Sequence, residues 1–337
     1  MRTWVVVAPP AEAESVRRTL HRSGLLRKDV RVARSDDGIA FPVLSPPLPP
    51  IEHTRAEERE LPVERTGPRS YRELLQLAPP LQALLPRAFD VLGDVVLIRL
   101  PGELEPHGPE IGAALLSFVP GARKVGWDRG VHGAVRLRQL TSIAGTGPWR
   151  TYHRENGLEF VVDPAVAYYS PRLAREHARV ASEVASGETV WDLCSGVGPF
   201  ALTIARRRLA GRIVAVDSNP AAIALLRENA ERLGVAGRID VRLQAVDQFL
   251  PSAGSADRVV LNLPHEGIKY LPSVSAAVAP GGTLHYYEVT PRVDHSMREN
   301  ALVNQLASPA EWTCVEARQV HPYSPQADLV AFTLRRK

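Results

Sequence analysis

The segment ETVWDLCSGVGPFALTIARRRLAGRIVAVDSNP, residues 188–220, determines the fold class of the C-terminal part of this chain. It predicts a buried strand (188–193), a glycine turn, a helix from Pro199 and a second strand (212–217). The same alternation continues through PAAIALLRENAERLG, RIDVRLQAV, DRVVLNL, TLHYYEV and DHSMRENALVNQLA. This spacing predicts an α/β fold with a doubly wound, mostly parallel sheet. Two last strand-like runs, EWTCVEARQV and QADLVAFTLRR, predict that a C-terminal antiparallel hairpin completes the sheet.

The turn after the first strand has the composition of a nucleotide-binding loop. Gly196, Gly198 and Ala201 fit the pattern G-x-G-x-x-A, in which glycines let the backbone approach a ligand closely. Such a match alone is weak, and the segment can also be an ordinary strand–turn–helix in which Ser195 caps the helix.

Three features favour S-adenosylmethionine as the ligand of this turn. Asp192 precedes the glycines, where a carboxylate can face the methionine amino group. Asp217 ends the next strand, where it can accept both ribose hydroxyls. The C-terminal hairpin is typical of the class I methyltransferase fold. Because dehydrogenases need an acid at the place of Asp217, a nicotinamide-dependent oxidoreductase remains the alternative from another class.

Other residues near this turn have open or structural interpretations. Asn219 precedes Pro220 and can be a helix N-cap, an adenine contact, or both. Ala245 stands where many methyltransferases place an adenine-contacting acid, with Asp247 two residues later. Cys194 is interpreted as a packed small residue, because no His/Asp arrangement accompanies it.

A polar tripeptide, Asn262-Leu263-Pro264, follows the fourth strand of this region. Ligands of doubly wound sheets bind at the carboxyl ends of the strands. An asparagine there offers a carbonyl oxygen and an amide NH₂ to a planar base, and a proline fixes the backbone beside it. The alternative is a loop that merely ends a strand.

The N-terminal part predicts two smaller α/β modules before the doubly wound sheet. Residues 1–45 predict a basic βαββ unit with strands at 3–8, 30–34 and 38–44 and a helix at 11–24. Residues 46–70 are proline-rich and charged and predict a linker. Residues 71–165 predict a middle α/β domain, and 166–337 predict the domain that binds S-adenosylmethionine and carries out catalysis.

Composition narrows the class of protein further. The formal charge is +4, the pI is about 9.2, and residues 1–35 contain eight Lys/Arg against three Asp/Glu. This distribution is compatible with a nucleic-acid partner and equally with an arginine-rich genome. Two cysteines are too few for a disulfide framework or a four-cysteine zinc site. No run approaches the roughly 18 apolar residues of a membrane span, so we expect a cytoplasmic protein without membrane or metal.

Several motifs together resemble the archaeal and eukaryotic type of tRNA (guanine-37-N1)-methyltransferase. The resemblance covers about residues 84–337, and over residues 1–45 it extends only to size and pattern. The matching segments are LLPRAFDVLGDVVLIRLPGELEP (84–106), HRENGLEFVVD (153–163), YYSPRLAREHARV (168–180), DLCSGVGPF (192–200), AVDSNP (215–220), NLP (262–264) and YSPQADLVAFTL (323–334).

The resemblance implies roles for individual residues. It implies Glu176 as the general base, Arg136 as the transition-state arginine and Asn262 as the residue that holds the guanine. It places S-adenosylmethionine against Tyr168, Asp192, Gly196, Gly198, Asp217, Asn219, Asn262, Leu263 and Pro264. It places the tRNA substrate against Arg136, Arg138, Arg154, Asn262 and Pro264.

The implied chemistry explains these residue types. Guanine N1 carries a proton and is a poor nucleophile at neutral pH, so methylation requires that proton to leave. A carboxylate can accept it, especially if partial burial raises the carboxylate's pKa. Negative charge then develops on guanine O6, where a fixed guanidinium stabilises it. The scheme needs no metal.

The same residues also have structural interpretations. Glu176 lies in a helical pattern, where it can pair with Arg172 or Arg179 on the surface. Arg136 and Arg138 alternate along a strand and can form a solvated basic face that binds phosphate.

Further alternatives concern the neighbouring polar residues and the overall function. Residues 153–157 can be a polar turn that closes a hairpin, and His177 and His265 are assigned no chemistry. The nearest alternative function is a wybutosine-pathway enzyme that methylates a tricyclic guanine derivative or transfers an aminocarboxypropyl group. The NLP motif disfavours aminocarboxypropyl transfer. A non-catalytic RNA-binding protein is a third alternative.

The expected partner is tRNA, held at the anticodon loop and possibly at the elbow by residues 1–45. We expect a base flipped out of its stack, salt-sensitive binding and a monomeric enzyme.

Overall fold

The computed structural model describes residues 1–337 except 28, 48, 62–66, 134–136, 293–294 and 325. The chain divides into two compact units, Met1–Ser70 and Tyr71–Lys337, which are described separately. No helix among the described residues is both long and apolar enough to cross a membrane.

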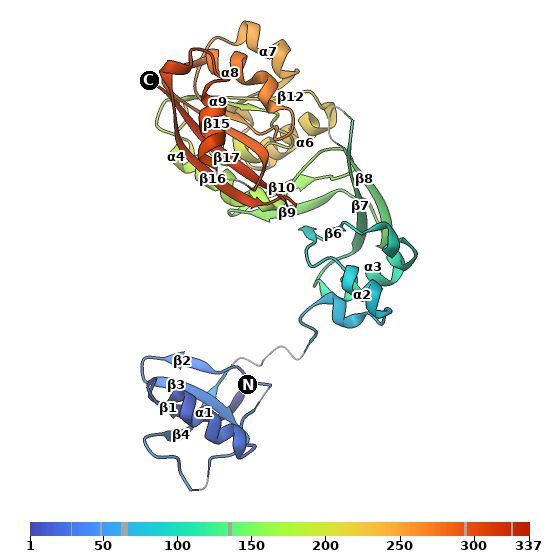
Figure 1. Ribbon diagram of the computed structural model, residues 1–337, viewed down its shortest axis with the longest axis vertical. Helices are drawn as coiled ribbons and strands as arrows, with labels where there is room; N and C mark the ends of the chain where they lie inside the picture. Colours follow the sequence, from blue (N-terminus) through green and yellow to red (C-terminus); the bar gives the residue numbers. More distant parts are fainter. Residues whose placement is uncertain (28, 48, 62–66, 134–136, 293–294, 325) are drawn as a thin grey trace. The chain divides into compact units, whose positions relative to one another are not determined.

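The first unit is a four-stranded antiparallel sheet with one helix (Figure 1). Its elements are β1 (Arg2–Ala8), α1 (Ala13–Arg22), β2 (Ala33–Ser35), β3 (Gly38–Val43) and β4 (Arg55–Glu60), and the strand order is β2-β3-β1-β4. The predicted βαββ pattern and the hairpin at Gly38 are confirmed, since Ser35 pairs with Gly38 across β2 and β3.

Strand β4 corrects the prediction that residues 46–70 are only a linker. Arg55–Glu60 pairs antiparallel with β1 along its whole length. Its sequence, RAEERE, lacks the buried apolar residues that mark a strand, and its side chains are exposed or half-buried. Backbone pairing with an available edge therefore formed a strand that the hydrophobic pattern did not indicate.

The second unit begins with a small mixed sheet of order β5-β6-β7-β8. The predicted strands in 90–100 and 133–145 and the helix in 108–120 are confirmed over their described residues, whereas strand β7 was not predicted. The elements are η1 (Tyr71–Leu74), α2 (Pro79–Leu84), β5 (Asp90–Leu92), β6 (Val95–Ile98), η2 (Gly102–His107), α3 (Gly108–Phe118), β7 (Lys124–His132) and β8 (Leu137–Gly145).

A two-stranded hairpin connects this module to the large sheet. Strands β9 (Thr151–Glu155) and β10 (Leu158–Val162) pair antiparallel around Asn156-Gly157. Both turn residues have positive φ, +50° and +75°, as a two-residue type I′ turn requires. The alternative interpretation of residues 153–157 as a hairpin turn is therefore met at Asn156-Gly157, whereas residues 153–155 belong to β9.

The large sheet has seven strands in the order β13-β12-β11-β14-β15-β17-β16. Strands β13 to β15 are parallel, and β17 and β16 are the predicted antiparallel hairpin. The fold-class prediction is confirmed. The strands are β11 (Thr189–Leu193), β12 (Arg212–Asp217), β13 (Ile239–Leu243), β14 (Ala256–Leu261), β15 (Val278–Pro291), β16 (Trp312–Pro322) and β17 (Ala327–Arg336).

Helices cover both faces of this sheet because buried side chains alternate along its strands. Val190 and Ile213 join the core on one face, and Trp191 and Val214 join the core on the other. Helices on the first face are α4 (Ala174–Glu183, after η3, Pro171–Leu173), α5 (Pro199–Arg207) and α6 (Pro220–Arg232). Helices on the second face are α7 (Val246–Ala253), α8 (Leu271–Ala276) and α9 (His295–Val303).

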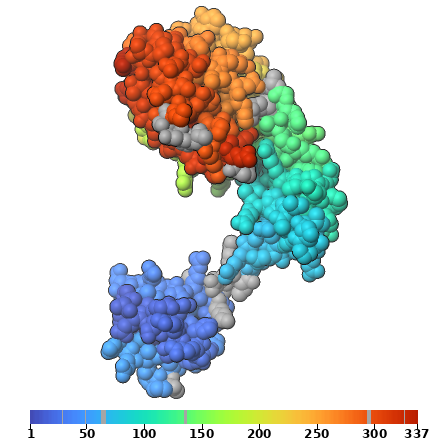
Figure 2. Space-filling model, viewed as in Figure 1, coloured from blue at the N-terminus to red at the C-terminus, as the bar shows by residue number. Residues whose placement is uncertain are grey.

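Three short 3₁₀ turns complete the second unit: η4 (Ala236–Arg238), η5 (Gly267–Tyr270) and η6 (Pro309–Glu311). In the space-filling view, its visible surface contains residues of the small mixed sheet, in cyan to green, and of the C-terminal strands, in orange to red (Figure 2). The two modules thus have separate sheets but belong to one compact unit.

Candidate functional site

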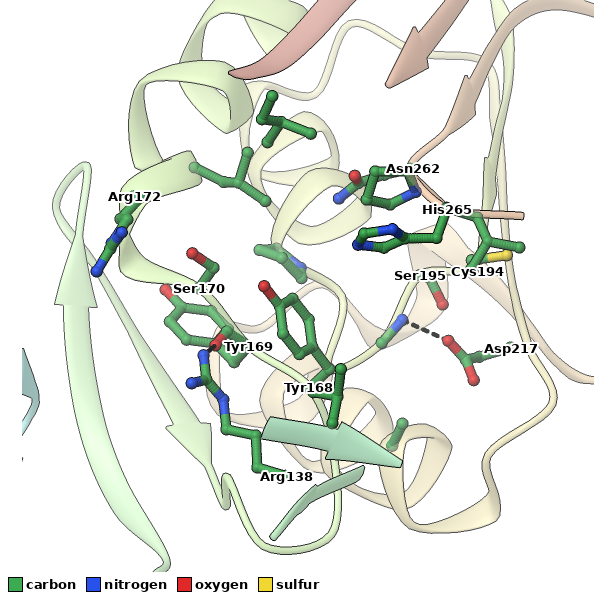
Figure 3. Close-up of a pocket in the computed structure, with 18 of the residues that line it drawn as sticks. Arg138, Tyr168, Tyr169, Ser170, Arg172, Cys194, Ser195, Asp217, Asn262 and His265 are labelled. Carbon is green, nitrogen blue, oxygen red and sulfur yellow. Dashed lines mark hydrogen bonds between the residues drawn. The ribbon is translucent and has the colours of Figure 1, made fainter. Parts of the chain in front are cut away.

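A cavity of about 820 Å³ lies at the carboxyl ends of strands β11, β12 and β14. Residues that follow these strands form one wall, which we call the strand-end wall: Cys194, Ser195, Gly196, Asp217, Asn219, Asn262, Leu263 and Pro264. The opposite wall comes from the small sheet and the segment before α4, and includes Arg138, Tyr168, Tyr169, Ser170 and Arg172 (Figure 3). His177, on α4, also borders it. A doubly wound sheet binds ligands at this edge.

The glycine turn contributes backbone to the strand-end wall. Gly196 lines the cavity and has φ +56°, which permits the tight turn out of β11. Gly198 is not on the cavity wall. A Cβ on Gly198 would lie 2.7 Å from the Leu226 Cγ atom, so this glycine allows α5 to pack against α6. The prediction of a ligand contact by Gly198 is not met in this structure.

Asp217 is the carboxylate of the strand-end wall. Its oxygens accept hydrogen bonds from the backbone N–H groups of Gly196, at 2.7 Å, and Asn219, at 2.8 Å (Figure 3 draws the first). Burial raises the pKa of Asp217, and the backbone hydrogen bonds lower it in part. The side chain is thereby fixed at the end of β12, where a ribose would lie in this fold.

The residues considered as adenine contacts, Asn219, Ala245 and Asp247, differ in whether they border the cavity. The Asn219 side chain accepts from the Ala221 N–H at 3.0 Å and donates to the Val166 carbonyl at 2.8 Å. Asn219 borders the cavity, but its side chain acts as the N-cap of α6. Ala245 also lines the cavity, together with Gln244 and Val246, whereas Asp247 is exposed and outside it.

Asp192 corrects a second prediction for the cofactor site. The side chain is fully buried and does not line the cavity. One oxygen accepts from the Ala201 N–H at 3.1 Å, and the other has no partner among the described residues. Burial raises the pKa of Asp192 to about 7. Asp192 therefore stabilises the first turn of α5 and does not contact the cavity directly.

Asn262, Leu263 and Pro264 line the cavity, as the sequence predicted for residues after the fourth strand. Asn262 lies beside His265 in the close-up, across the cavity from Tyr168 (Figure 3). His265 is 3.1 Å from the Tyr323 hydroxyl, so this end of the cavity is also bordered by the C-terminal hairpin.

Arg138 lines the cavity but is not the solvated phosphate-binding group that the sequence suggested. It is 8% exposed, and its guanidinium forms an ion pair with Asp128 and lies 3.7 Å from Asp90. It also donates to the Tyr169 carbonyl at 3.1 Å (Figure 3). Arg138 therefore supports the opposite wall.

Two other predicted substrate-binding arginines are not on the described wall. Arg136 lies outside the described residues. Arg154 is on β9, with 84% of its side chain exposed, and pairs with Glu159 at 2.9 Å. It does not border the cavity. Sequence proximity to the HRENG motif did not distinguish the outward-facing side of this hairpin from the inward-facing one.

Glu176, the predicted base, is 2% exposed and does not line the cavity. Its carboxylate pairs with Arg318 at 2.7 Å, accepts from the Tyr287 hydroxyl at 3.1 Å and lies 3.4 Å from Arg179. Burial raises the pKa of Glu176, but these partners lower it further, and the net pKa is below its usual value. The expectation of a raised pKa is therefore wrong. The alternative pairing with Arg179 is present, but it is buried and not on the surface.

Sequence reasoning missed several cavity residues. Arg172, from the SPR motif, donates to Asp90 at 2.8 Å and borders the cavity. His177, which follows Glu176, borders the cavity although it was assigned no chemistry. Gln244 borders the position expected for adenine. The SPR motif was a usable signal for Arg172, whereas nothing local distinguishes His177 from its neighbours.

The strand order, the C-terminal hairpin and the ligand cavity at the glycine turn define the class I methyltransferase fold. Residues 151–315 match the family model described as the TRM5/TYW2 methyltransferase domain, and residues 71–148 match the TYW2 N-terminal domain. The chain belongs to the TRM5/TYW2 methyltransferase family.

Full-length relatives support this membership. The chain is 32% identical to the tRNA (guanine(37)-N(1))-methyltransferase Trm5b of Pyrococcus abyssi, over 99% of both chains. The crystal structure of that protein superposes with a TM-score of 0.74. A solved complex of aTrm5 and tRNALeu is 27% identical, covers 99% of both chains and has a TM-score of 0.73.

One relative has a different printed activity. The tRNA(Phe) (4-demethylwyosine(37)-C(7)) aminocarboxypropyltransferase of Pyrococcus horikoshii is 29% identical over 65% of this chain and 78% of its own length. This match covers less of the chain than the match to Trm5b.

Proposed function

We propose that this protein transfers a methyl group from S-adenosylmethionine to N1 of guanosine 37 in tRNA. The observation that carries the proposal is the cavity, which brings a fixed carboxylate, Asp217, and the Asn262–Pro264 segment to one sheet edge. Full-length similarity to Trm5b supports the same reaction.

The residues on the strand-end wall fit S-adenosylmethionine. Asp217 is positioned to accept the ribose hydroxyls, Gly196 presents backbone at close approach, and Gln244 to Val246 border the place of the adenine. When bound, the cofactor supplies an electrophilic methyl group to this cavity. Nicotinamide chemistry has no support from the family or from the C-terminal hairpin.

Glu176 is the proposed proton acceptor for guanine N1. In this structure the carboxylate is ionised but a weak base, because Arg318 and Arg179 lower its pKa. It lies on α4 next to His177, which borders the cavity. For Glu176 to reach the base, its contact with Arg318 has to open when the guanine enters.

Two further residues are proposed to hold the guanine. Asn262 is positioned to hydrogen-bond the planar base edge from the end of β14. Arg136 is proposed from the resemblance to stabilise the charge that develops on O6. The proton on N1 passes to Glu176 while the N1–methyl bond forms and the sulfur–methyl bond breaks.

Access of a tRNA base to this cavity requires the nucleotide to leave its stack. Arg87, Arg99 and Arg172 also border the cavity and place positive charge where the adjacent phosphates would lie. We propose that the first unit, with its basic N-terminal residues, makes additional contact with the tRNA.

The experiment uses transcribed tRNA with guanosine or adenosine at position 37, labelled S-adenosylmethionine, and identification of the modified nucleoside. N1-methylguanosine formed only from the guanosine transcript is the expected result. Cofactor binding without any labelled nucleoside on either transcript would contradict the proposal and favour a non-catalytic protein or a modified-base substrate.

The second candidate function comes from the wybutosine-type relative and the TYW2 N-terminal match. Aminocarboxypropyl transfer breaks a different sulfur–carbon bond, so its by-product is 5′-methylthioadenosine instead of S-adenosylhomocysteine. Chromatography of the by-product distinguishes the two reactions. A tricyclic guanine derivative at position 37 can be tested as a methyl acceptor in the same assay.

A further inference from the structure

His177 is a buried polar side chain on the opposite wall to which the proposed reaction assigns no role. It lies on α4, is 1% exposed and borders the cavity. Its Nδ1 atom is 2.7 Å from a carboxylate oxygen of Glu155, on β9. The other oxygen of Glu155 accepts from the Tyr169 hydroxyl at 2.7 Å. The ring also packs edge-on against Phe200, with centroids 4.5 Å apart, so its orientation is fixed.

These contacts determine which ring nitrogen is left without a hydrogen-bond partner. Burial raises the pKa of Glu155, but the hydrogen bonds from His177 and Tyr169 lower it further, and the carboxylate is ionised. A carboxylate oxygen only accepts, so Nδ1 carries the proton. In the neutral ring, Nε2 is then a hydrogen-bond acceptor. Nε2 is buried and has no partner among the described residues.

An unpartnered buried acceptor is unfavourable by about 1–3 kcal/mol, unless a ligand supplies the missing hydrogen bond. Glu155 does not border the cavity, whereas His177 does. The imidazole therefore lies between the carboxylate and the cavity. This arrangement resembles the way a carboxylate orients a histidine toward a ligand in metal sites and catalytic sites.

The position of His177 along the sheet edge indicates which part of the ligand it meets. Gln244 to Val246 follow β13, Asp217 follows β12, and the glycine turn follows β11. Phe200 is in the first turn of α5, directly after that glycine turn. Because His177 contacts Phe200, it lies near the end of β11. Along the sheet edge, this place follows the adenine position after β13 and the ribose position at β12. The amino-acid end of the cofactor would occupy this place.

The charge at this end favours a cation. Glu155 is ionised behind His177 and contributes negative charge at this end. A carboxylate field of this kind attracts an ammonium group and disfavours a second carboxylate.

We propose that His177 Nε2, oriented by Glu155, accepts a hydrogen bond from the α-ammonium group of S-adenosylmethionine. The proposal rests on cofactor binding by the proposed methyltransferase but not on the identity of the tRNA base. His177 is thus a specificity determinant for the amino-acid end of the cofactor.

Calorimetry with two non-reactive probes tests this contact. S-adenosylhomocysteine has the α-ammonium group, and its desamino analogue lacks only that group. We expect the wild-type protein to bind S-adenosylhomocysteine at least tenfold more tightly than the analogue. His177→Phe should bind the two probes with affinities within about threefold of each other, because it has lost the acceptor.

Two further variants control the experiment. His265→Phe removes a different histidine that borders the cavity and should keep the wild-type preference. Glu155→Gln keeps the ring but removes the charge behind it, and should reduce the preference partly. If His177→Phe does not fold and therefore binds neither probe, the proposal is tested by the preference that Glu155→Gln shows for S-adenosylhomocysteine.

A His177→Phe variant that folds and still prefers S-adenosylhomocysteine tenfold overturns the proposal. So does an unchanged affinity combined with a slower methyl transfer at saturating cofactor, since Nε2 would then face the guanine. Failure of methylation on every tRNA, with the probe preference intact in the wild type, would contradict the proposed function and leave this contact supported.

Discussion

The two walls of the cavity differ in how their side chains are positioned. On the strand-end wall, Asp217 and Asn262 directly follow strands, and backbone N–H groups fix the Asp217 carboxylate. On the opposite wall, Arg138 and His177 are fixed by side chains of neighbouring strands, Asp128 on β7 and Glu155 on β9. The first wall depends on backbone groups at strand ends, and the second depends on pairing between side chains of different elements.

This difference implies a division of labour. The strand-end wall has the features of a cofactor site, which is shared by the fold class. The opposite wall comes from the small sheet, the segment before α4 and α4 itself, and it contains His177, the group proposed to select the amino-acid end of the cofactor. The proposed proton acceptor, Glu176, is on the same helix but does not border the cavity. Variants on the two walls should therefore change different measured quantities.

The largest effect on stability is expected where α6 contacts the β9–β10 hairpin. Asn229, on α6, is fully buried; its side chain accepts from the Val161 N–H at 2.7 Å and donates to the Val161 carbonyl at 3.0 Å. Asn229→Leu leaves both groups of β10 unpaired and should lower the free energy of unfolding by about 3 kcal/mol, measured with urea. Asn300→Leu, on the exposed side of α9, is the control. An equal effect in both variants would contradict the role of Asn229.

Cofactor affinity should depend most on Asp217. In Asp217→Asn the amide replaces one acceptor oxygen and removes the charge that ribose hydroxyls would meet. The affinity for S-adenosylhomocysteine should fall about a hundredfold, which corresponds to about 2.7 kcal/mol. Calorimetry measures this change, with Asp247→Asn, outside the cavity, as the matched control. An unchanged affinity in Asp217→Asn would remove the ribose assignment.

Much of the strand-end wall was predictable from the sequence. Gly196, Asp217 and Asn262 were found because strand ends and glycine turns have short-range signals. Asp192 was misplaced because a position four residues before the glycines does not reveal that its side chain points beneath α5. The sheet order and the C-terminal hairpin were likewise predictable from the alternation of elements.

The opposite wall and the residues behind it were less predictable, because their contacts join side chains of different elements. Glu176 pairs with Arg318, and no local sequence pattern predicts that partner. The same reason explains why Arg138 was expected to be solvated and why β4, which has no apolar side, was interpreted as linker.

Asp192 makes stability pH-dependent in a defined direction. Its pKa is about 7 in the folded protein and 3.8 as the reference for the unfolded chain, so the folded state binds more protons between these values. The wild-type free energy of unfolding should therefore fall as the pH rises from 5 to 8, by about 2.5 kcal/mol from this group. Asp192→Asn should lack this contribution. Parallel urea-derived pH curves for the two proteins would contradict the assignment.

The smallest expected effect separates two arginines near the opposite wall. Arg172 borders the cavity, whereas Arg154 pairs with Glu159 on the exposed side of β9. Arg172→Ala should lower kcat/KM for tRNA about tenfold through a lost phosphate contact, and Arg154→Ala less than about twofold. Steady-state methylation measures both. A larger loss in Arg154→Ala would restore the substrate contact predicted from sequence.

The division of labour is tested most directly by single-turnover methylation of guanosine-37 tRNA with Glu176→Gln at saturating S-adenosylmethionine. The rate should fall at least about a hundredfold, because the proton acceptor is lost. The affinity for S-adenosylhomocysteine should stay within about twofold of wild type, and Glu183→Gln, also on α4, should change neither quantity. An unchanged rate in Glu176→Gln, or a loss of cofactor affinity that accounts for the slower rate, would contradict the account.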